Sequence, residues 1–417
     1  GIPSRRKRSF SVFQEGGGCG VLVVAIMVWL VVVGGLVGII VVIRLCFWLT
    51  SKSVPKLPCP SPLPEEERRK ERGEKGEGKG ECCLITGGLG YLGKELVLEL
   101  IKKGEYSSIR VLDLPPSLPP QFNDLPIEYF QIDLVAACKR EGNHQQQLET
   151  ALEGVNTVFH AAGIVRLDRQ FNLLFNLHVS GTANLINTCQ KIGIDQIIHT
   201  SSVAVMVDMH STSVIDADES HPLPWGNFAS EYGETKATGE RLYQTHASNL
   251  RHLILRPAPI YGINDPILIA PLLRGEVPVL PKGGVGCWVY IDNIVQAHVK
   301  ADQLLKKHPS LSGNTYFITD GGPGDISVLI RSLLSLLSNT PPASLPKSLA
   351  SLPPTLPTMP PFAFQGLVWV MEGAGWLTCW RWGRERAFQV TTSALRHIIC
   401  DNWFKIDAAK KDFGYDP

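Results

Sequence analysis

The sequence predicts an α/β protein with a doubly wound parallel sheet, preceded by one transmembrane helix and completed by a small C-terminal substrate-binding region. Three observations support this prediction. Short apolar runs alternate with helical patterns from residue 82 onward, a glycine-rich turn follows the first apolar run, and an uncharged stretch of 23 residues precedes both. Strands that alternate with helices imply a parallel sheet with right-handed crossovers and helices on both faces.

The uncharged stretch Val21–Ile43 is longer than the roughly 20 apolar residues that span a bilayer, so we interpret it as a membrane anchor. The alternative is a cleaved signal peptide, but its apolar region is shorter and ends in a small-residue cleavage site. The expected divisions are a basic N-terminal segment at 1–20, a transmembrane helix at 21–43, a Pro-rich and charged linker at 44–81, the main α/β domain at 82–335, and a low-complexity and C-terminal region at 336–417 that completes the substrate side.

Charge and cysteine content exclude two classes of function. The net charge of +1 gives no bulk attraction to nucleic acid, so we expect no nucleic-acid partner. The 10 cysteines are scattered and form no Cys-x-x-Cys pair, so we expect neither a metal site nor a disulfide framework.

The first apolar run, Cys82–Ile85, leads into Thr86-Gly87-Gly88-Leu89-Gly90-Tyr91-Leu92-Gly93, and an amphipathic run follows. A strand, a glycine turn and a helix in this order bind a diphosphate, because backbone N–H groups and the helix N-terminus face the ligand. In this pattern Gly87 permits the tight turn, Gly90 lets the backbone approach the pyrophosphate, and Gly93 lets the helix pack closely on the strand. We therefore expect a Rossmann-type cofactor site that includes Gly87, Gly90, Tyr91, Leu92 and Gly93.

The next apolar run, Ile109–Asp113, ends in an acid 20 residues after Gly93. An acid at this distance accepts hydrogen bonds from the adenosine ribose. A 2′-phosphate would meet the charge of Asp113, so the sequence favours NAD over NADP. The alternative is that Asp113 is only a polar residue at the start of a loop.

Four further strands are expected beyond Asp113, at 127–134, 157–163, 196–202 and 252–256. Helices are expected at 171–192 and 231–248. Asp133 and Leu134 would lie near the adenine, and the small residues Ala161 and Ala162 would leave room for the cofactor.

The run Glu231-Tyr232-Gly233-Glu234-Thr235-Lys236 places Tyr232 and Lys236 four residues apart, on one face of a helix. An ammonium group beside a phenol stabilises the phenolate, which makes the tyrosine usable as a proton acceptor. Ser202 ends a preceding strand of the same sheet. The glycine turn, the Tyr-x-x-x-Lys pair and this serine together predict a catalytic site.

These motifs resemble those of the extended short-chain dehydrogenases/reductases, and within them the 3β-hydroxysteroid dehydrogenase/isomerase group. Further residues that match are Phe159–Gly163, Thr200–Ser202, Arg256–Gly262, Val289–His298 and Ala409–Pro417. The resemblance implies that Tyr232 takes the hydroxyl proton while NAD accepts the hydride. It also implies that Lys236 holds the nicotinamide ribose and lowers the pKa of Tyr232, that Ser202 hydrogen-bonds the substrate oxygen, and that Pro257 lines the nicotinamide.

Two positions depart from the pattern of this family. Val207 stands where the family usually has glycine, and His178 stands where it has an asparagine that helps to position the lysine. His178 could donate a similar hydrogen bond or be an ordinary helix residue.

The segment 263–288 is rich in aliphatic residues and poor in charge, which suits an apolar ligand, although an ordinary core is the alternative. With the membrane anchor, it favours a small apolar alcohol or ketone, a steroid or sterol, as substrate. The alternatives are an extended-family reductase of another small carbonyl, or a non-catalytic NAD-binding sensor or scaffold.

We expect a single-pass protein of the endoplasmic reticulum membrane. Basic residues flank both sides of 21–43, so they define no orientation. The chain has no Asn-x-Ser/Thr sequon, and soluble NAD is plentiful in the cytosol, so we place the catalytic domain there. The sequence is compatible with a homodimer without indicating one.

Overall fold

The computed structural model describes residues 80–417 except 167–169, 211–212, 248, 263–264, 268–279, 282–283, 326–327, 329, 333, 336–357, 361, 364–365 and 367–399. The expected segments 1–20 and 21–43, and all but the last two residues of 44–81, lie outside these residues. Within the described part of the chain, no helix combines the length and the hydropathy that crossing a membrane requires.

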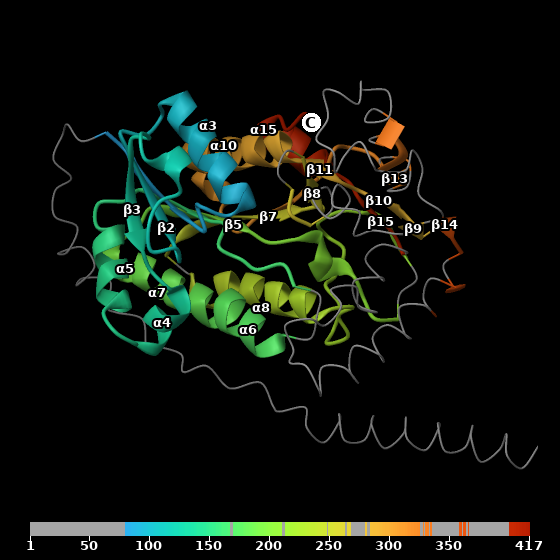
Figure 1. Cartoon of the computed structure of the whole chain (residues 1–417), viewed down its shortest axis with the longest axis horizontal. Coiled ribbons are helices and arrows are strands. Elements are labelled where there is room, and N and C mark those ends of the chain that lie inside the picture. Colours follow the sequence, from blue (N-terminus) through green and yellow to red (C-terminus); the bar gives the residue numbers. More distant parts are fainter. Residues whose placement is uncertain are drawn as a thin grey trace, which may run out of the picture. The chain divides into compact units, whose positions relative to one another are not determined.

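The main sheet has 7 strands in the order β12-β7-β5-β4-β1-β2-β3, and every pair in it is parallel (Figure 1). From β1, the chain first adds β2 and β3 on one side, and then adds β4, β5, β7 and β12 on the other. This reversal of strand order between β1 and β4 is the arrangement of a doubly wound fold. The strands are β1 (Cys82–Thr86), β2 (Ser108–Asp113), β3 (Ile127–Gln131), β4 (Thr157–His160), β5 (Gln196–Thr200), β7 (Arg251–Pro257) and β12 (Thr315–Ile318).

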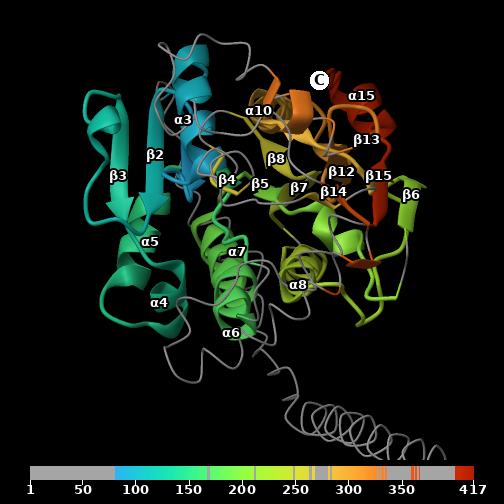
Figure 2. The same cartoon turned by 45° about the vertical axis from the view of Figure 1, so that its right-hand side comes forward.

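The central strands are buried on both faces. All residues of β1, β4 and β5 are buried, because helices cover the sheet from both sides (Figures 1 and 2). The helices α3 (Tyr91–Lys103), α10 (Ile291–Lys307) and α15 (Asp407–Phe413) form one layer. The other layer contains α4 (Leu134–Lys139), α5 (His144–Leu152), α6 (Phe171–Phe175), η2 (Asn176–Gly181), α7 (Thr182–Ile192) and α8 (Glu231–His246).

Two of these elements differ from the expectation. The strand expected at 127–134 ends at Gln131, because the carboxylate of Asp133 accepts hydrogen bonds from the N–H groups of Val135 and Ala136 and so caps α4. The helical run expected at 171–192 is present, but residues 176–181 form a π-helical turn between two α-helical parts.

A smaller sheet lies beside the carboxyl edge of the main one, with the order β13-β10-β15-β6 (Figure 1). Its strands join distant parts of the chain, since β15 near the C-terminus pairs with β6 in parallel. Two further strand pairs, β8 with β11 and β9 with β14, complete this side. These strands are β6 (Ser213–Ala217), β8 (Ile260–Tyr261), β9 (Leu280–Pro281), β10 (Val285–Gly286), β11 (Val289–Tyr290), β13 (Gly324–Asp325), β14 (Thr358–Met359) and β15 (Asp401–Phe404).

At the opposite, amino edge of the main sheet, the buried carboxylate of Asp302 on α10 joins several elements. It accepts hydrogen bonds from Tyr106 (2.7 Å), Thr157 (3.0 Å) and Gln196 (2.7 Å), and the ammonium group of Lys306 lies 3.0 Å from it. This network fixes α10 to the starts of β4 and β5 and to the loop before β2.

Candidate active site

The predicted site residues gather at one edge of the main sheet, where its parallel strands end. The glycine turn follows β1, Asp113 ends β2, and the alanine pair follows β4. Ser202 follows β5, and Pro257 ends β7. In open α/β sheets ligands bind outside the carboxyl ends of the strands, where the strand order reverses. The sequence motifs thus converge on the position where this fold places its ligand.

The glycine turn is packed too tightly for side chains. Gly87 has φ +69°, and a Cβ atom placed on it would lie 2.7 Å from the Cα of Ala162. A Cβ atom on Gly93 would lie 2.1 Å from the carbonyl oxygen of Gly87. Gly90 precedes α3 directly, so the free N–H groups of this helix start at the turn. The roles expected of Gly87 and Gly93 agree with these contacts, and the turn fits a diphosphate.

Asp113 lies at the edge of this turn. Its carboxylate accepts hydrogen bonds from the N–H groups of Leu89 (2.8 Å) and Leu114 (2.7 Å), which fixes the acid against the glycine turn. The following residues, 114–122, include no lysine or arginine that would pair with a 2′-phosphate. The donor set therefore fits NAD.

Asp133 and Leu134 lie beside this region at the start of α4. One carboxylate oxygen of Asp133 accepts the hydrogen bonds that cap α4. Leu134 is buried and packs against Gly181. The hydroxyl of Tyr91 is buried and has no hydrogen-bond partner among the described residues. It lies 3.2 Å from a Cβ atom placed on Gly262, and thus faces the segment after β8.

Helix α8, which carries Tyr232 and Lys236, packs closely against two neighbours through glycines. A Cβ atom on Gly233 would lie 2.5 Å from the oxygen of Ala204 in η3 (Val203–Met206), and one on Gly239 would lie 2.7 Å from the oxygen of His178. Ser202 caps η3, accepting a hydrogen bond from the N–H of Ala204 at 3.2 Å. These contacts bring the side chains of Tyr232 and Ser202 together.

The phenol of Tyr232 is buried, and the side chain of Ser202 lies near enough to influence its pKa. Burial raises the pKa of Tyr232 to about 12, and Ser202 opposes that shift. The lowering by Lys236 that we expected does not appear. The ammonium group of Lys236 instead donates to the carbonyl oxygen of Thr200 at 2.9 Å. Burial lowers the pKa of Lys236 to about 8, against the effect of the nearby carboxylate of Glu240.

Two buried groups near the site were not identified from the sequence. Arg256, which precedes Pro257, forms a two-point ion pair with Glu240 of α8, at 3.0 Å from Nε and 2.7 Å from Nη2. The spacing of Glu240 and Arg256 in the sequence does not predict this pair. The one available signal was that Arg256 follows the apolar run Leu253–Leu255, because a buried arginine needs a partner of opposite charge.

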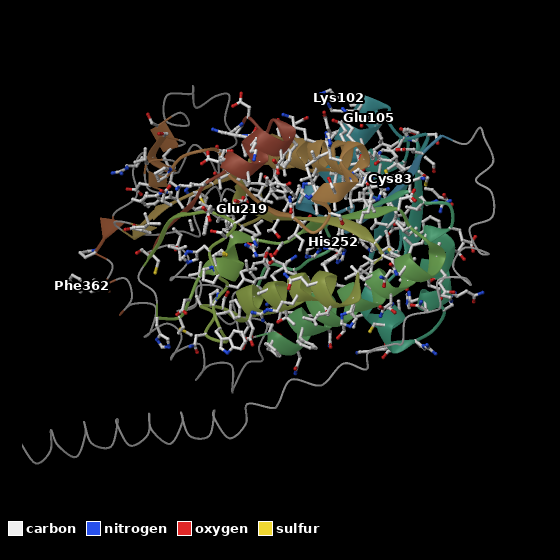
Figure 3. All side chains as sticks on the ribbon, turned by 180° about the vertical axis from the view of Figure 1, so that it is seen from behind. Cys83, Lys102, Glu105, Glu219, His252 and Phe362 are labelled. Atoms are coloured by element: carbon white, nitrogen blue, oxygen red, sulfur yellow. The ribbon has the colours of Figure 1, made fainter. Side chains whose placement is uncertain are left out.

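The second group is a row of rings in tilted contact, contributed by β4, β5, α8 and β7. His160, His199, Tyr243 and His252 follow one another with ring centroids 5.1, 4.9 and 5.1 Å apart. Of these four residues, His252 is labelled in Figure 3. Neither ring nitrogen of His199 has a hydrogen-bond partner within the described part of the chain. At the other end, His160 contacts Thr86 (2.7 Å) and Thr182 (3.0 Å).

The two departures from the expected pattern also have structural explanations. Val207 ends η3 with φ −88°, an extended conformation that needs no glycine. His178 is buried, and its ring nitrogens lie 3.0 Å from the hydroxyl of Thr235 and 3.2 Å from the N–H of Ile164. It is therefore not an ordinary helix residue. Its two hydrogen bonds go to Thr235 and Ile164, and neither goes to Lys236.

A doubly wound sheet with a glycine turn, an acid after the second strand and a Ser, Tyr and Lys set at its carboxyl edge defines a Rossmann-type dehydrogenase or reductase. The model of the 3-beta hydroxysteroid dehydrogenase/isomerase family matches residues 84–347. The chain belongs to this family. It is therefore an NAD-dependent oxidoreductase that acts on CH–OH donors.

Curated proteins that are similar to this chain have names that match this family. The chain is 27% identical over 352 residues to the 3beta-hydroxysteroid-dehydrogenase/decarboxylase isoform 1 of Arabidopsis thaliana, covering 80% of this chain and 76% of the relative. It is 28% identical over 349 residues to a 3 beta-hydroxysteroid dehydrogenase/Delta 5-->4-isomerase of Mycobacterium tuberculosis, covering 80% and 85%. A short-chain dehydrogenase/reductase superfamily protein from Agrobacterium tumefaciens, solved with bound NAD, has the same fold with a TM-score of 0.56, 18% identity and coverage of 81% and 93%.

Proposed function

We propose that this protein oxidises the 3β-hydroxyl group of a steroid or sterol, with Tyr232 as the proton acceptor. The observation that carries the proposal is that Ser202 lies close enough to Tyr232 to lower its pKa, at the carboxyl edge of the sheet, with Lys236 one helical turn away. A serine and a tyrosine placed side by side can both reach one alcohol oxygen, which is the geometry that proton abstraction from a hydroxyl requires.

Each residue then has a defined role. Ser202 hydrogen-bonds the alcohol oxygen, and Tyr232 takes its proton while the carbinol C–H bond breaks. NAD, when bound, supplies the acceptor for that hydride, so an alcohol gives a ketone, NADH and one proton. Lys236 is assigned to the nicotinamide ribose, which its ammonium group would hold by hydrogen bonds. Pro257, Ala161 and Ala162 border the same edge without adding charge.

The substrate class is inferred from the relatives and from the composition of the substrate side. Both relatives described above are named for 3β-hydroxysteroid dehydrogenation. Segment 263–288, which the sequence assigns to the substrate side, carries few charges, although 268–279 lie outside the described residues. Ile267, within the described part, is 59% exposed, which is compatible with an apolar surface facing a ligand.

The membrane anchor is also part of this proposal. Its support is the hydropathy of 21–43 alone. We place the protein in the endoplasmic reticulum membrane with residues 82–417 on the cytosolic side. Protease digestion of sealed microsomes tests this, since a C-terminal portion that survives digestion would contradict the orientation. Sedimentation of the detergent-solubilised protein would decide whether it is a homodimer.

The decisive experiment incubates membranes carrying the full chain with NAD and pregnenolone, a 3β-hydroxysteroid, and follows NADH absorbance. We expect NADH to appear with the unmodified protein and not with Tyr232→Phe. NADH that forms only with other alcohols in a substrate panel would support the reductase alternative. Cofactor quenching of tryptophan fluorescence without turnover of any alcohol would support the sensor or scaffold.

A further inference from the structure

His178 occupies a π-helical turn where two helices touch. The turn Asn176–Gly181 interrupts the helical run 171–192, and such turns redirect side chains because they contain an extra residue. The carbonyl oxygen of His178 lies 2.7 Å from a Cβ atom placed on Gly239, so the backbones of η2 and α8 are in direct contact. His178 itself is only 3% exposed.

The two ring nitrogens of His178 bond to different segments of the site. The N–H of Ile164 donates to Nε2 at 3.2 Å, so Nε2 is an acceptor and the proton is assigned to Nδ1. Nδ1 lies 3.0 Å from the hydroxyl of Thr235 and therefore donates to it. That hydroxyl in turn donates to the carbonyl oxygen of Tyr232 at 3.1 Å. One ring thus links the segment after β4 to the first turns of α8.

The same ring borders both proposed catalytic side chains. Its centroid lies 5.6 Å from that of Tyr232, with the two rings edge to face at 77°. A Cβ atom placed on Gly163 would lie 3.1 Å from Nζ of Lys236 and 3.6 Å from Nε2 of His178. Gly163 therefore lies between the ammonium group and the imidazole, and the absence of a side chain there lets them share this space.

The ring is suited to keep one donor and one acceptor. Burial, and to a smaller extent the charge of Lys236, lower the pKa of His178 well below its ordinary value. The imidazole is therefore neutral under ordinary conditions. A protonated ring would present two donors and would lose the bond from Ile164.

We propose that His178 is a positioning residue, a neutral ring whose simultaneous hydrogen bonds to Ile164 and Thr235 hold the segment 161–166 at a fixed distance from the turn of α8 that carries Tyr232 and Lys236. His178 acts on the reaction through the positions of Tyr232 and Lys236, and it touches neither the substrate nor the reacting atoms. The kinetic part of this inference rests on the proposed function, whereas the hydrogen-bond part does not.

Three substitutions separate the two bonds. His178→Asn keeps a polar group near the position of Nδ1, and so can reach Thr235 but not Ile164. His178→Gln keeps one near Nε2, and so can reach Ile164 but not Thr235. His178→Leu removes both at similar volume. Thr235→Val removes the acceptor of the ring. Thr238→Val is its matched control, because among the described residues the hydroxyl of Thr238 bonds only to the carbonyl oxygen of Glu234, one turn along the same helix.

The first measurement is independent of any substrate. Amide hydrogen exchange by mass spectrometry, on the full chain without NAD or steroid, follows the peptide that contains Ile164. We expect exchange to rise by about tenfold in His178→Leu and His178→Asn, the factor that loss of one buried hydrogen bond implies, and to stay near the original value in His178→Gln. Unchanged exchange in His178→Leu and His178→Asn would overturn the proposal. If His178→Leu does not fold, the Asn and Gln variants still decide.

The second measurement uses NAD and pregnenolone. We expect His178→Leu and Thr235→Val each to lower kcat by about tenfold or more with KM nearly unchanged, and to shift the pH profile of kcat to higher pH. Their combination should cost no more than either alone, and Thr238→Val should have no effect. A lower Tm with unchanged kcat and pH profile would reduce His178 to a packing role and refute the proposal. If the unmodified protein does not oxidise pregnenolone, the proposed function fails, and the exchange measurement still tests the bonds of His178.

Discussion

A Cβ atom on Gly233 would lie 2.5 Å from the carbonyl oxygen of Ala204, so α8 packs directly on η3, the short helix that follows Ser202. Both partners of this contact are backbone, which cannot move away as the end of a flexible side chain can. Tyr232 directly precedes Gly233, and Ser202 lies two residues before Ala204. The glycine therefore sets how close the phenol comes to the serine hydroxyl.

We expect Gly233→Ala to separate α8 from η3. The overlap with backbone should cost about 1–3 kcal/mol of stability, as overpacking usually does, and should lower turnover by more than the stability loss explains. Thermal unfolding and steady-state kinetics below the unfolding temperature measure the two effects. Gly322→Ala is the control, because no atom lies within 4 Å of a Cβ atom placed there. Equal turnover in the two variants would contradict the role of this contact.

Tyr232→Phe should abolish turnover and leave NAD binding intact. Loss of a general base costs about 10²–10⁴-fold in rate, whereas the phenyl ring retains the packing of the phenol. Stopped assays for NADH and fluorescence titration with NAD measure these effects. Tyr243→Phe is a matched control on the same helix, because its buried hydroxyl has no hydrogen-bond partner among the described residues. Turnover that survives in Tyr232→Phe would refute the assignment.

Oxidation should be fastest at alkaline pH. The base form of Tyr232 is required, and burial raises its pKa to about 12, so activity rises with pH. The charged form of Lys236 is also required, and burial lowers its pKa to about 8, so further increase in pH removes that charge. The profile of kcat against pH should therefore be bell-shaped with its maximum above pH 8. An optimum below neutral pH would show that another group is the base.

The fold should lose stability in acid because it buries neutral histidines. Burial lowers the pKa of His160 from 6.5 to about 3, so the unfolded chain binds protons more tightly below pH 6.5. This contribution is complete above pH 6.5 and is lost as the pH falls toward 3, by up to about 1.4 kcal/mol per pH unit for each such group. His199→Phe should flatten the decline seen in urea unfolding, whereas exposed His221→Gln should not. An equal decline in all three proteins would exclude this cause.

Glu240→Ala should destabilise the protein strongly. Its carboxylate and the guanidinium of Arg256 lie 2.7 Å apart with side chains only 4% and 7% exposed, so removal of one leaves a buried charge unpaired. Such a loss costs about 3–5 kcal/mol. The control is Glu149→Ala, which breaks the surface pair with Lys191 (60% exposed) and should cost less than about 1 kcal/mol. Urea unfolding measures the free energy of unfolding of both variants. Similar losses would mean that the buried ion pair contributes no more to stability than the surface pair.

Local patterns predicted most of the parallel sheet. The runs that begin at Cys82, Ile109, Thr157 and Gln196 are rich in apolar residues and flanked by glycine or by helical periodicity, and each forms a strand. The expected third strand was too long, because Ile132 and Leu134 continue its alternation of apolar and polar residues. That alternation contains no sign that Asp133 caps a helix. The small sheet was not predicted, since two-residue strands such as Val285–Gly286 have no periodicity.

The site was predicted to the extent that its residues lie in short motifs. Tyr232 and Lys236 share a helix face whatever surrounds them, and the glycines specify their own turn. By contrast, the bonds of His178 to Ile164 and Thr235 join segments 14 and 57 residues away. Only the packing of η2 on α8 brings these residues together, so no local pattern could reveal them. The burial that raises the pKa of Tyr232 is likewise a property of the whole fold.

The carboxylate of Asp302 has a consequence for synthesis. Its partners Tyr106, Thr157 and Gln196 leave the ribosome 196, 145 and 106 residues before it does. Until α10 has been translated and docked, these donors at the amino edge of the sheet have no anion to receive them, and the strands that carry them lack one covering layer. A nascent chain that stalls before residue 302 therefore exposes apolar strands to chaperones, and cooperative closure of the nucleotide-binding half waits for a helix encoded late in the message.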